Sequence, residues 1–366
     1  MVESDRTPGD GFAAARSAPR IGLFDIMQMD PITGHDPGEM YRTRLDDLAL
    51  ADELGLSVAF TAERHFLQTY ACPSATTWLA AASQRTSRIR LGVLAYTLPI
   101  RAPVQLAEEI AVLDWLSNGR IEIGMGLGHR VEELSALGVD PAERVSLFQQ
   151  RLALLRGLWS GGEVSFERDD VRLRKVTIAP LPVQAPHPPL WFAGTDPGAA
   201  HWMGAQGMGL AVGFKSTNEL QPAVAAFIAG RAIRTPEVIA SEPPHRSGSI
   251  ALMRSVVVGE SEDRVRSEIT DDLVRISERM DRNGGTPSER RESARHQIDA
   301  MIRNEVMFAG SPEQVADGIL RAQSGIPFDL LLANVYAMGA SRERIRTSIR
   351  LLAGPVTEQC RQAILA

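Results

Sequence analysis

A short charged cluster follows an apolar run in the first quarter of the chain. The run Val58-Ala59-Phe60-Thr61-Ala62 leads directly into Glu63, Arg64 and His65. An apolar run of this length, bounded by turn signals, is typical of a strand that is buried on both faces. The acid, the guanidinium and the imidazole then stand at the carboxyl end of that strand, where parallel α/β barrels carry their catalytic groups. We therefore take these three residues as candidate catalytic residues.

Polar residues also follow the other predicted strands. They are Asp25 and Gln28, Tyr96 and Thr97, His129 and Arg130, Gly194 to Asp196, and Phe214 and Lys215. The segment Gly194-Thr195-Asp196-Pro197-Gly198 ends a strand and opens a helix, so its N–H groups would point at an anion such as a phosphate. The structural alternatives are an ordinary tight turn for this segment, a buried paired acid for Glu63 and a structural histidine for His65.

Composition excludes several other classes of protein. The chain has 366 residues, of which 44% are hydrophobic and 23% charged, and its net charge of -6 gives no support to a nucleic-acid partner. Its cysteines, Cys72 and Cys360, fit neither a disulfide framework nor a metal site, so we expect a reducing cytoplasm. No metal triad stands out among the histidines, and no apolar run approaches the ~20 residues that span a bilayer.

Eight strand-like runs, mostly alternating with helical patterns, organise the chain. The strands are expected at 20–25, 58–66, 89–95, 120–125, 190–194, 209–212, 249–258 and 328–333, and the helices at 37–54, 73–83, 103–116, 141–159, 197–206, from 311, and at 341–352. This rhythm predicts an α/β fold, and eight units favour a single closed (β/α)8 TIM barrel over an open doubly wound sheet. Gly124, Gly126 and Gly128 have the wrong spacing for a dinucleotide fingerprint, which weakens the open alternative.

Three segments do not belong to this rhythm. Residues 1–19 are rich in small and polar residues and are expected to form a disordered leader before a barrel domain over 20–366. Residues 161–189 alternate in polarity around Asp169-Asp170 and predict a hairpin insertion. Residues 282–295 read as a mobile excursion, which is either an active-site lid or an unstructured surface insertion.

Over residues 20–352 the chain resembles the bacterial luciferase-like, flavin-dependent monooxygenases. The first signature, Ala62-Glu63-Arg64-His65-Phe66, is similar to the family's Glu-His-His-Phe motif after strand two. The second runs from Leu98-Pro99-Ile100-Arg101-Ala102-Pro103 through Ala107-Glu108-Glu109 and Leu113-Asp114 to Ser117-Asn118-Gly119-Arg120. The third is Pro189-Leu190-Trp191-Phe192-Ala193-Gly194, followed by an Ala-rich helix that carries Trp202.

The resemblance implies an enzyme that uses reduced FMN and O2 to oxygenate a small organic substrate through a C4a-peroxyflavin. An NAD(P)H-dependent flavin reductase would supply the reduced FMN, and a cytoplasmic homodimer is expected. The flavin ring would lie against Leu94 and Ala95, where the family often has a bulge or a non-prolyl cis peptide. Phe214 would stand near the ring, and Gly194, Thr195 and Asp196 would hold the phosphate. Arg64 and His65 would polarise or protonate the peroxide, with Glu63 orienting them.

The chain departs from the family pattern at two positions. Arg64 occupies the place of the first histidine, and an arginine cannot serve as a general base, although it could stabilise an anion. Leu127 stands where the family's flavin-phosphate arginine is expected, so either Arg130 replaces that arginine or flavin binds weakly. These departures leave two alternatives open. One is a deazaflavin-dependent hydride-transfer oxidoreductase of the same fold, and the other is a flavin-binding partner subunit that has lost turnover.

Overall fold

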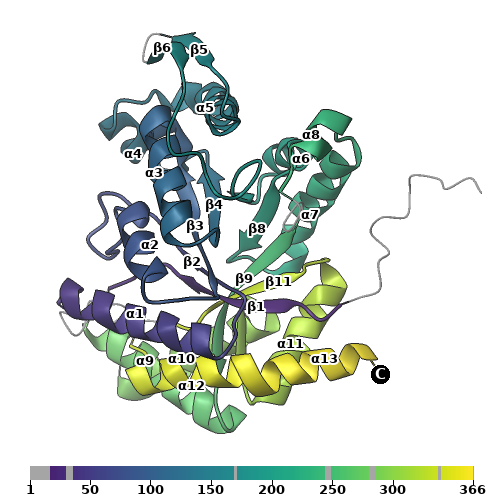
Figure 1. Cartoon of the computed structure of the whole chain (residues 1–366). Coiled ribbons are helices and arrows are strands. Elements are labelled where there is room, and N and C mark those ends of the chain that lie inside the picture. Colours follow the sequence, from purple (N-terminus) through teal and green to yellow (C-terminus); the bar gives the residue numbers. More distant parts are fainter. Residues whose placement is uncertain are drawn as a thin grey trace, which may run out of the picture.

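The computed structural model describes residues 17–29, 36–168, 171–243, 249–279, 286–336 and 339–365. Within these ranges, eight parallel strands form a closed barrel (Figure 1). They are β1 (Arg20–Asp25), β2 (Val58–Thr61), β3 (Arg90–Thr97), β4 (Ile121–Gly126), β7 (Leu190–Ala193), β8 (Gly209–Gly213), β9 (Ile250–Val258) and β11 (Leu330–Asn334). Each strand pairs with the next one in this order, and the last strand, β11, pairs with the first, β1, which closes the barrel. The predicted TIM barrel is confirmed.

Helices connect the strands on the outside of the barrel (Figure 1). They are α1 (Pro37–Glu53), α2 (Ala75–Ser83), α3 (Pro103–Leu116), α4 (Val131–Ala136), α5 (Arg144–Trp159), α6 (Pro197–Ala205), α7 (Thr217–Ala232), α8 (Pro236–Ala240), α11 (Pro312–Gly325), α12 (Arg342–Leu351) and α13 (Thr357–Leu365). The helix start predicted at Ser311 is confirmed, because Ser311 and Gln314 form a capping box. Helix α7 also begins with a capping box, formed by Ser216 and Glu219, which was not predicted from the sequence.

The interior of the barrel is closed by aromatic side chains. Phe60 and Trp191 meet edge to face with ring centroids 5.9 Å apart. Beneath them the buried Glu122 accepts a hydrogen bond from Trp191 Nε1 at 2.7 Å and pairs with Arg90. A side chain at Gly92 would collide with the Phe60 ring, so glycine is required where this ring fills the barrel. The barrel interior is therefore a packed core that leaves no room for a ligand.

The chain leaves the barrel rhythm in two places. Strands β5 (Val164–Arg168) and β6 (Val171–Val176) form an antiparallel pair, within the segment where a hairpin is predicted. Helices α9 (Glu262–Arg279) and α10 (Pro287–Arg303) and strand β10 (Met307–Gly310), which pairs with β9, separate β9 from α11. Within the expected excursion over 282–295, residues from 286 onward are not unstructured, because a Thr286–Glu289 capping box starts α10 there, and the lid alternative stays a prediction. Residues 282–285, like 1–16 of the predicted leader, lie outside the described residues.

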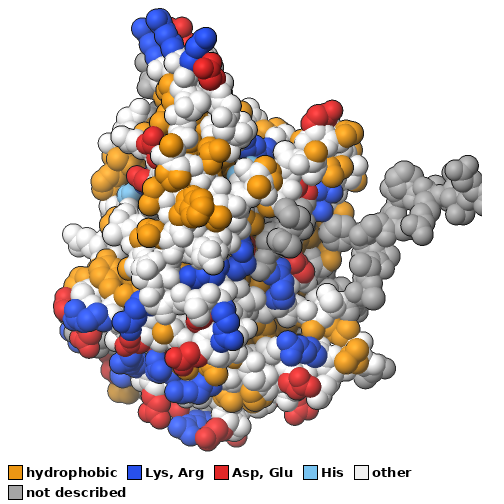
Figure 2. Space-filling model, viewed as in Figure 1, with side chains coloured by type: hydrophobic (Ala, Val, Ile, Leu, Met, Phe, Trp, Pro, Cys, Tyr) orange, Lys and Arg blue, Asp and Glu red, His pale blue; other side chains and the backbone are white. Residues whose placement is uncertain are grey.

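Part of the surface is apolar. Figure 2 shows hydrophobic side chains gathered over the face that α3 presents in this view, and Val112, Trp115 and Leu116 of this helix are exposed. Trp115 Nε1 donates to Leu181 O at 2.8 Å, which joins the helix to the exposed apolar residues before β7. No helix in the part of the chain that the structure describes is long and apolar enough to cross a membrane.

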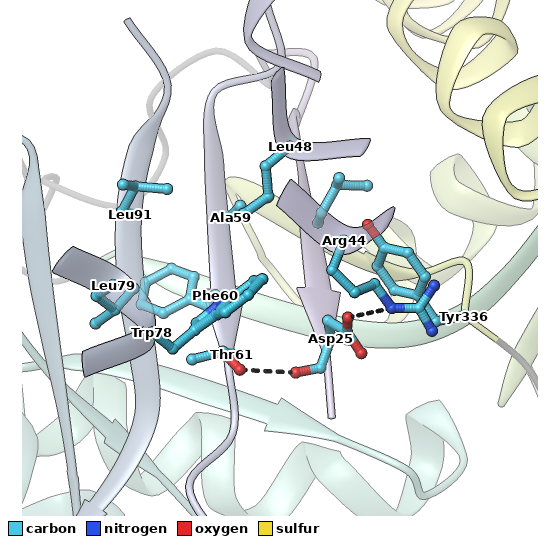
Figure 3. A pocket seen from close by; sticks show the side chains of 11 residues that line it. Asp25, Arg44, Leu48, Ala59, Phe60, Thr61, Trp78, Leu79, Leu91 and Tyr336 are labelled. Carbon is cyan, nitrogen blue, oxygen red and sulfur yellow. Dashed lines mark hydrogen bonds and ion pairs between the residues drawn. The ribbon is translucent and has the colours of Figure 1, made fainter. Parts of the chain in front are cut away.

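Asp25 belongs to a small buried cavity of about 20 Å³ outside the barrel wall (Figure 3). Its Oδ2 lies 2.8 Å from Arg44 Nε, and Met27 N donates to its Oδ1 at 2.7 Å. The Arg44 guanidinium stacks over the Tyr336 ring, 3.8 Å from its centroid. Burial raises the pKa of Asp25, and Arg44 opposes this rise. This strand-end acid therefore ties α1 to the barrel and does not line the mouth cavity described below.

Replacing Arg44 by methionine would leave Asp25 buried without its cation. We expect the free energy of unfolding to fall by about 3 kcal/mol, since a buried charge without a partner keeps its desolvation cost. Urea denaturation measures the loss. The double variant Arg44→Met/Asp25→Asn should recover much of it, because neither charge then remains. A double variant as unstable as the sum of the single variants would contradict this pairing.

Candidate active site

A cavity of about 830 Å³ opens at the carboxyl ends of the barrel strands. Its walls come from residues at or after the ends of β1, β2, β3, β4, β7, β8 and β9, and from α5 and α6. This volume is within the range of small-molecule and cofactor sites. All but two of the predicted site residues line it, namely Glu63, Arg64, Leu94, Ala95, Gly194, Thr195, Asp196 and Phe214. His65 and Arg130 do not, whereas His129 and Arg144 do.

Glu63 is buried and holds together the end of β2 and the start of α2. Its Oε2 accepts a hydrogen bond from Ala75 N at 3.2 Å, which caps α2 because the Ser74 side chain makes no cap bond. Arg101 Nη1 lies 3.8 Å from the same oxygen. Its Oε1 lies 3.4 Å from His65 Nε2. The hydrogen bond to Glu63 raises the pKa of His65, although burial opposes it. Glu63 is therefore a buried acid with partners, as the structural alternative predicted, and it also contacts the candidate catalytic residue His65.

Arg64 turns toward the cavity without a carboxylate partner. Within the described ranges, its guanidinium makes no hydrogen bond or ion pair, and its Nε is buried without a partner. The guanidinium lies 5.6 Å from the centroid of the Tyr70 ring. Burial, with Arg64 and Arg130 as nearby cations, lowers the pKa of His129, so this imidazole is neutral near neutral pH. The cavity therefore presents an arginine and a neutral histidine on this side.

The carboxylates of the cavity are all engaged by the protein itself. Glu63 is held as described above. Glu133 accepts from Thr97 Oγ1 at 3.5 Å and lies 3.7 Å from Arg130 Nη1. Asp196 caps α6 by accepting from Ala199 N at 2.8 Å. Arg144, by contrast, lines the cavity with no side-chain partner among the described residues. The cavity thus carries positive charge that the protein leaves unpaired.

One wall of the cavity has the apolar, irregular backbone that the resemblance implies. The Leu94–Ala95 peptide bond is cis, and the β3–β4 register shifts between Val93 and Tyr96, as expected. Phe214 adopts a left-handed backbone with φ of 61°, which is rare for a bulky residue. Its ring centroid lies 6.0 Å from that of Phe24. These residues form a surface that suits a flat aromatic ring system.

The amino end of α6 forms another part of the cavity wall. Gly198 and Ala199 of its first turn line the cavity together with Arg144 of α5. The two helices are in contact, because Phe148 and Trp202 meet edge to face at 6.3 Å. An amino end of a helix and an unpaired guanidinium are the usual elements of a phosphate site. Arg144 was not among the predicted site residues, because it starts a helix and does not directly follow a strand.

Arg130, the predicted replacement for the missing arginine, has other partners. Its Nη1 donates to His65 O at 3.1 Å and lies near Glu133. Leu127 lines the cavity, as its place after β4 implies. Arg130 therefore connects the end of β2 to α4, whereas Arg144 lines the cavity without a side-chain partner among the described residues.

The comparisons with known proteins agree with this architecture. The family model described as luciferase-like monooxygenase matches residues 20–326. An uncharacterized protein of Sinorhizobium fredii is 32% identical over 68% of this chain and 69% of that protein. The 4-hydroxyprotoasukamycin monooxygenase of Streptomyces nodosus subsp. asukaensis is 26% identical over 91% of this chain and 90% of that protein. The oxygenase component of the flavin-dependent trigonelline monooxygenase of Acinetobacter baylyi is 29% identical over 43% and 44%.

Solved structures share the fold. A monooxygenase from Streptomyces bottropensis superposes with a TM-score of 0.78 at 22% identity, covering 93% of this chain and 99% of that one. The oxygenating constituent of 3,6-diketocamphane monooxygenase from Pseudomonas putida, in complex with FMN, gives 0.76 at 18% identity over 93% and 99%. An F420-dependent secondary alcohol dehydrogenase gives 0.67 at 19% identity over 92% and 99%. Both flavin and deazaflavin enzymes thus occur on this barrel.

The Glu63–His65 contact predicts a pH-dependent stability. Because the pKa of His65 is raised above 6.5, its contribution to folding is complete below pH 6.5 and is lost as the pH rises through the raised value. NMR titration should show a His65 pKa above 6.5 that falls in Glu63→Gln. Replacing His65 by glutamine should cost roughly 1 kcal/mol at acidic pH and less at alkaline pH. An unchanged His65 titration in Glu63→Gln would show that the contact is not electrostatic.

Proposed function

The chain belongs to the luciferase-like monooxygenase family, and from this premise we propose that it oxygenates a small organic substrate with reduced FMN and O2. The observation that carries the proposal is the mouth cavity, which combines an apolar wall at Leu94 and Ala95 with the amino end of α6 and Arg144. The apolar wall suits a flavin ring. The helix end and the guanidinium suit its phosphate.

The residues of the cavity fit an FMN phosphate even though Leu127 donates nothing to it. We propose that Gly194, Thr195 and the first turn of α6 surround the phosphate while Arg144 neutralises its charge. Asp196 would contribute by capping α6 through Ala199 N, which holds the first turn of this helix in place. Arg144 replaces the missing arginine in this proposal, in preference to Arg130, which is already engaged by Glu133 and the backbone of His65.

When bound, reduced FMN would supply the electrons that activate O2. The side chains of Phe24, Leu94 and Phe214 would keep water from the reacting centre. The proton work cannot come from Arg64, because an arginine is no general base. We assign it to His129, a neutral imidazole on the cavity wall, with His65 as the alternative. Glu63 would hold His65, and Arg64 would stabilise negative charge.

A separate NAD(P)H-dependent flavin reductase would supply the reduced FMN. The support is the relative named as the oxygenase component of a flavin-dependent monooxygenase, since that name implies a second component. The homodimer stays a prediction from the resemblance, and sedimentation of the purified chain measures it.

Hydride transfer with a deazaflavin is the second candidate function. It is favoured by Leu127 and by the likeness to F420-dependent proteins, including the secondary alcohol dehydrogenase. Anaerobic titration with reduced FMN and with reduced F420 separates the two candidates. We expect micromolar binding of reduced FMN and, with a reductase, NADH and O2, production of hydrogen peroxide without substrate. Failure to bind reduced FMN at micromolar concentration would refute the proposed function. An activity that is unchanged in Arg64→Ala, His65→Ala and His129→Ala alike would favour a non-catalytic partner subunit.

The phosphate assignment makes a separable prediction. Arg144→Gln should weaken FMN binding by about tenfold or more, because a charge-assisted contact with the phosphate is lost. Arg130→Gln is the matched control and should change the FMN dissociation constant far less. Fluorescence titration with FMN and with riboflavin measures both. Riboflavin lacks the phosphate, so its affinity should be similar in Arg144→Gln and the unmodified protein. A larger loss of FMN affinity in Arg130→Gln would reverse the assignment.

A further inference from the structure

The mouth cavity has two unpaired arginines, and the proposed phosphate site uses only one of them. Arg144 lies with the amino end of α6, which follows β7. Arg64 follows β2, and β2 and β7 are separated by β3 and β4 in the barrel order. Three strand spacings of ~4.8 Å around the barrel separate the two strand ends. The two guanidinium groups therefore come from different parts of the cavity wall.

The surroundings of Arg64 indicate a site for a second anion. Arg64 lines the cavity, and its guanidinium has no carboxylate partner among the described residues, so an anion in the cavity could pair with it. The cavity's acids do not neutralise it, because Glu133 is engaged with Arg130 and Thr97, and Glu63 with Ala75, Arg101 and His65. Leu94 and Ala95 of the proposed flavin wall line the same cavity.

We propose that Arg64 binds a carboxylate group of the substrate, so that this enzyme acts on a small organic acid. The inference rests on the proposed function, since it places the acid beside the flavin ring. A guanidinium presents paired N–H donors in a fork that matches a planar carboxylate. His129 lines the same cavity and supplies a neutral ring nitrogen for a further hydrogen bond. The arginine that departs from the family's histidine thus acts as a specificity residue.

Because the Arg64 side chain is partly buried, this site would select acids over neutral analogues. A neutral amide of the same shape would fill the cavity but leave the guanidinium without a counter-charge. Discrimination by a site of this kind comes mainly from the unpaired group that the wrong ligand leaves behind.

The test compares carboxylic acids with their amides. Benzoate, hexanoate and nicotinate are titrated by calorimetry into the protein, with and without saturating FMN, beside benzamide, hexanamide and nicotinamide. We expect at least one acid to bind at least about tenfold more tightly than its amide. Arg64→Gln should remove that preference, and Arg64→Lys should restore part of it, because lysine keeps the charge but loses the fork.

Two outcomes would overturn the inference. One is that no acid of the panel binds better than its amide, and the other is that Arg64→Gln leaves the preference intact. Arg144→Gln is the matched control, since it should weaken FMN binding while acid binding to the FMN-saturated protein remains. The titration without FMN separates the two proposals. A preference for acids that depends on Arg64 in a protein that does not bind FMN would refute the proposed cofactor and preserve the acid site.

Discussion

The mouth of the barrel depends on the buried carboxylate of Glu63. It caps α2 through Ala75 N, receives Arg101 and contacts His65, so three segments of the chain meet at one side chain. A buried charge is tolerated only when its oxygen atoms are satisfied in this way. Because Glu63 uses Arg101 and His65, it makes no ion pair with its neighbour Arg64. The Arg64 guanidinium therefore lines the cavity without a carboxylate partner among the described residues.

The charges of the cavity follow from the same principle. Among the described residues, every carboxylate on its wall has a hydrogen-bond or ion-pair partner, whereas the guanidinium groups of Arg64 and Arg144 have none. The proposed phosphate and the proposed substrate carboxylate would each supply a counter-charge to one of these arginines. The apolar Leu94–Ala95 wall between these groups lowers the local dielectric, which strengthens both interactions.

Much of this fold could be predicted from the sequence, because the barrel strands are mostly apolar runs bounded by turn signals, even where a charged residue such as Glu122 or Arg254 stands within one. The strand β10 was missed since Met307–Gly310 is short, and α10 was read as an excursion because its charges obscured the Thr286 capping box. The strand-end rule found most of the cavity wall. It could not show that Arg130 is engaged by Glu133 or that Arg144 faces the cavity, because both facts depend on tertiary packing.

The departures from the family motif therefore have a physical interpretation. At position 64, an arginine in place of the family's histidine cannot act as a base, but it carries a permanent positive charge. At position 127, a leucine in place of the family's arginine cannot bind the phosphate, and we propose Arg144 for that role. The measurement that tests this account most directly is a structure of the protein with FMN bound. The account predicts the phosphate within hydrogen-bonding distance of Arg144 and the first turn of α6, with the ring against Leu94 and Ala95. A phosphate bound to Arg64 or Arg130, or a ring away from that wall, would contradict it.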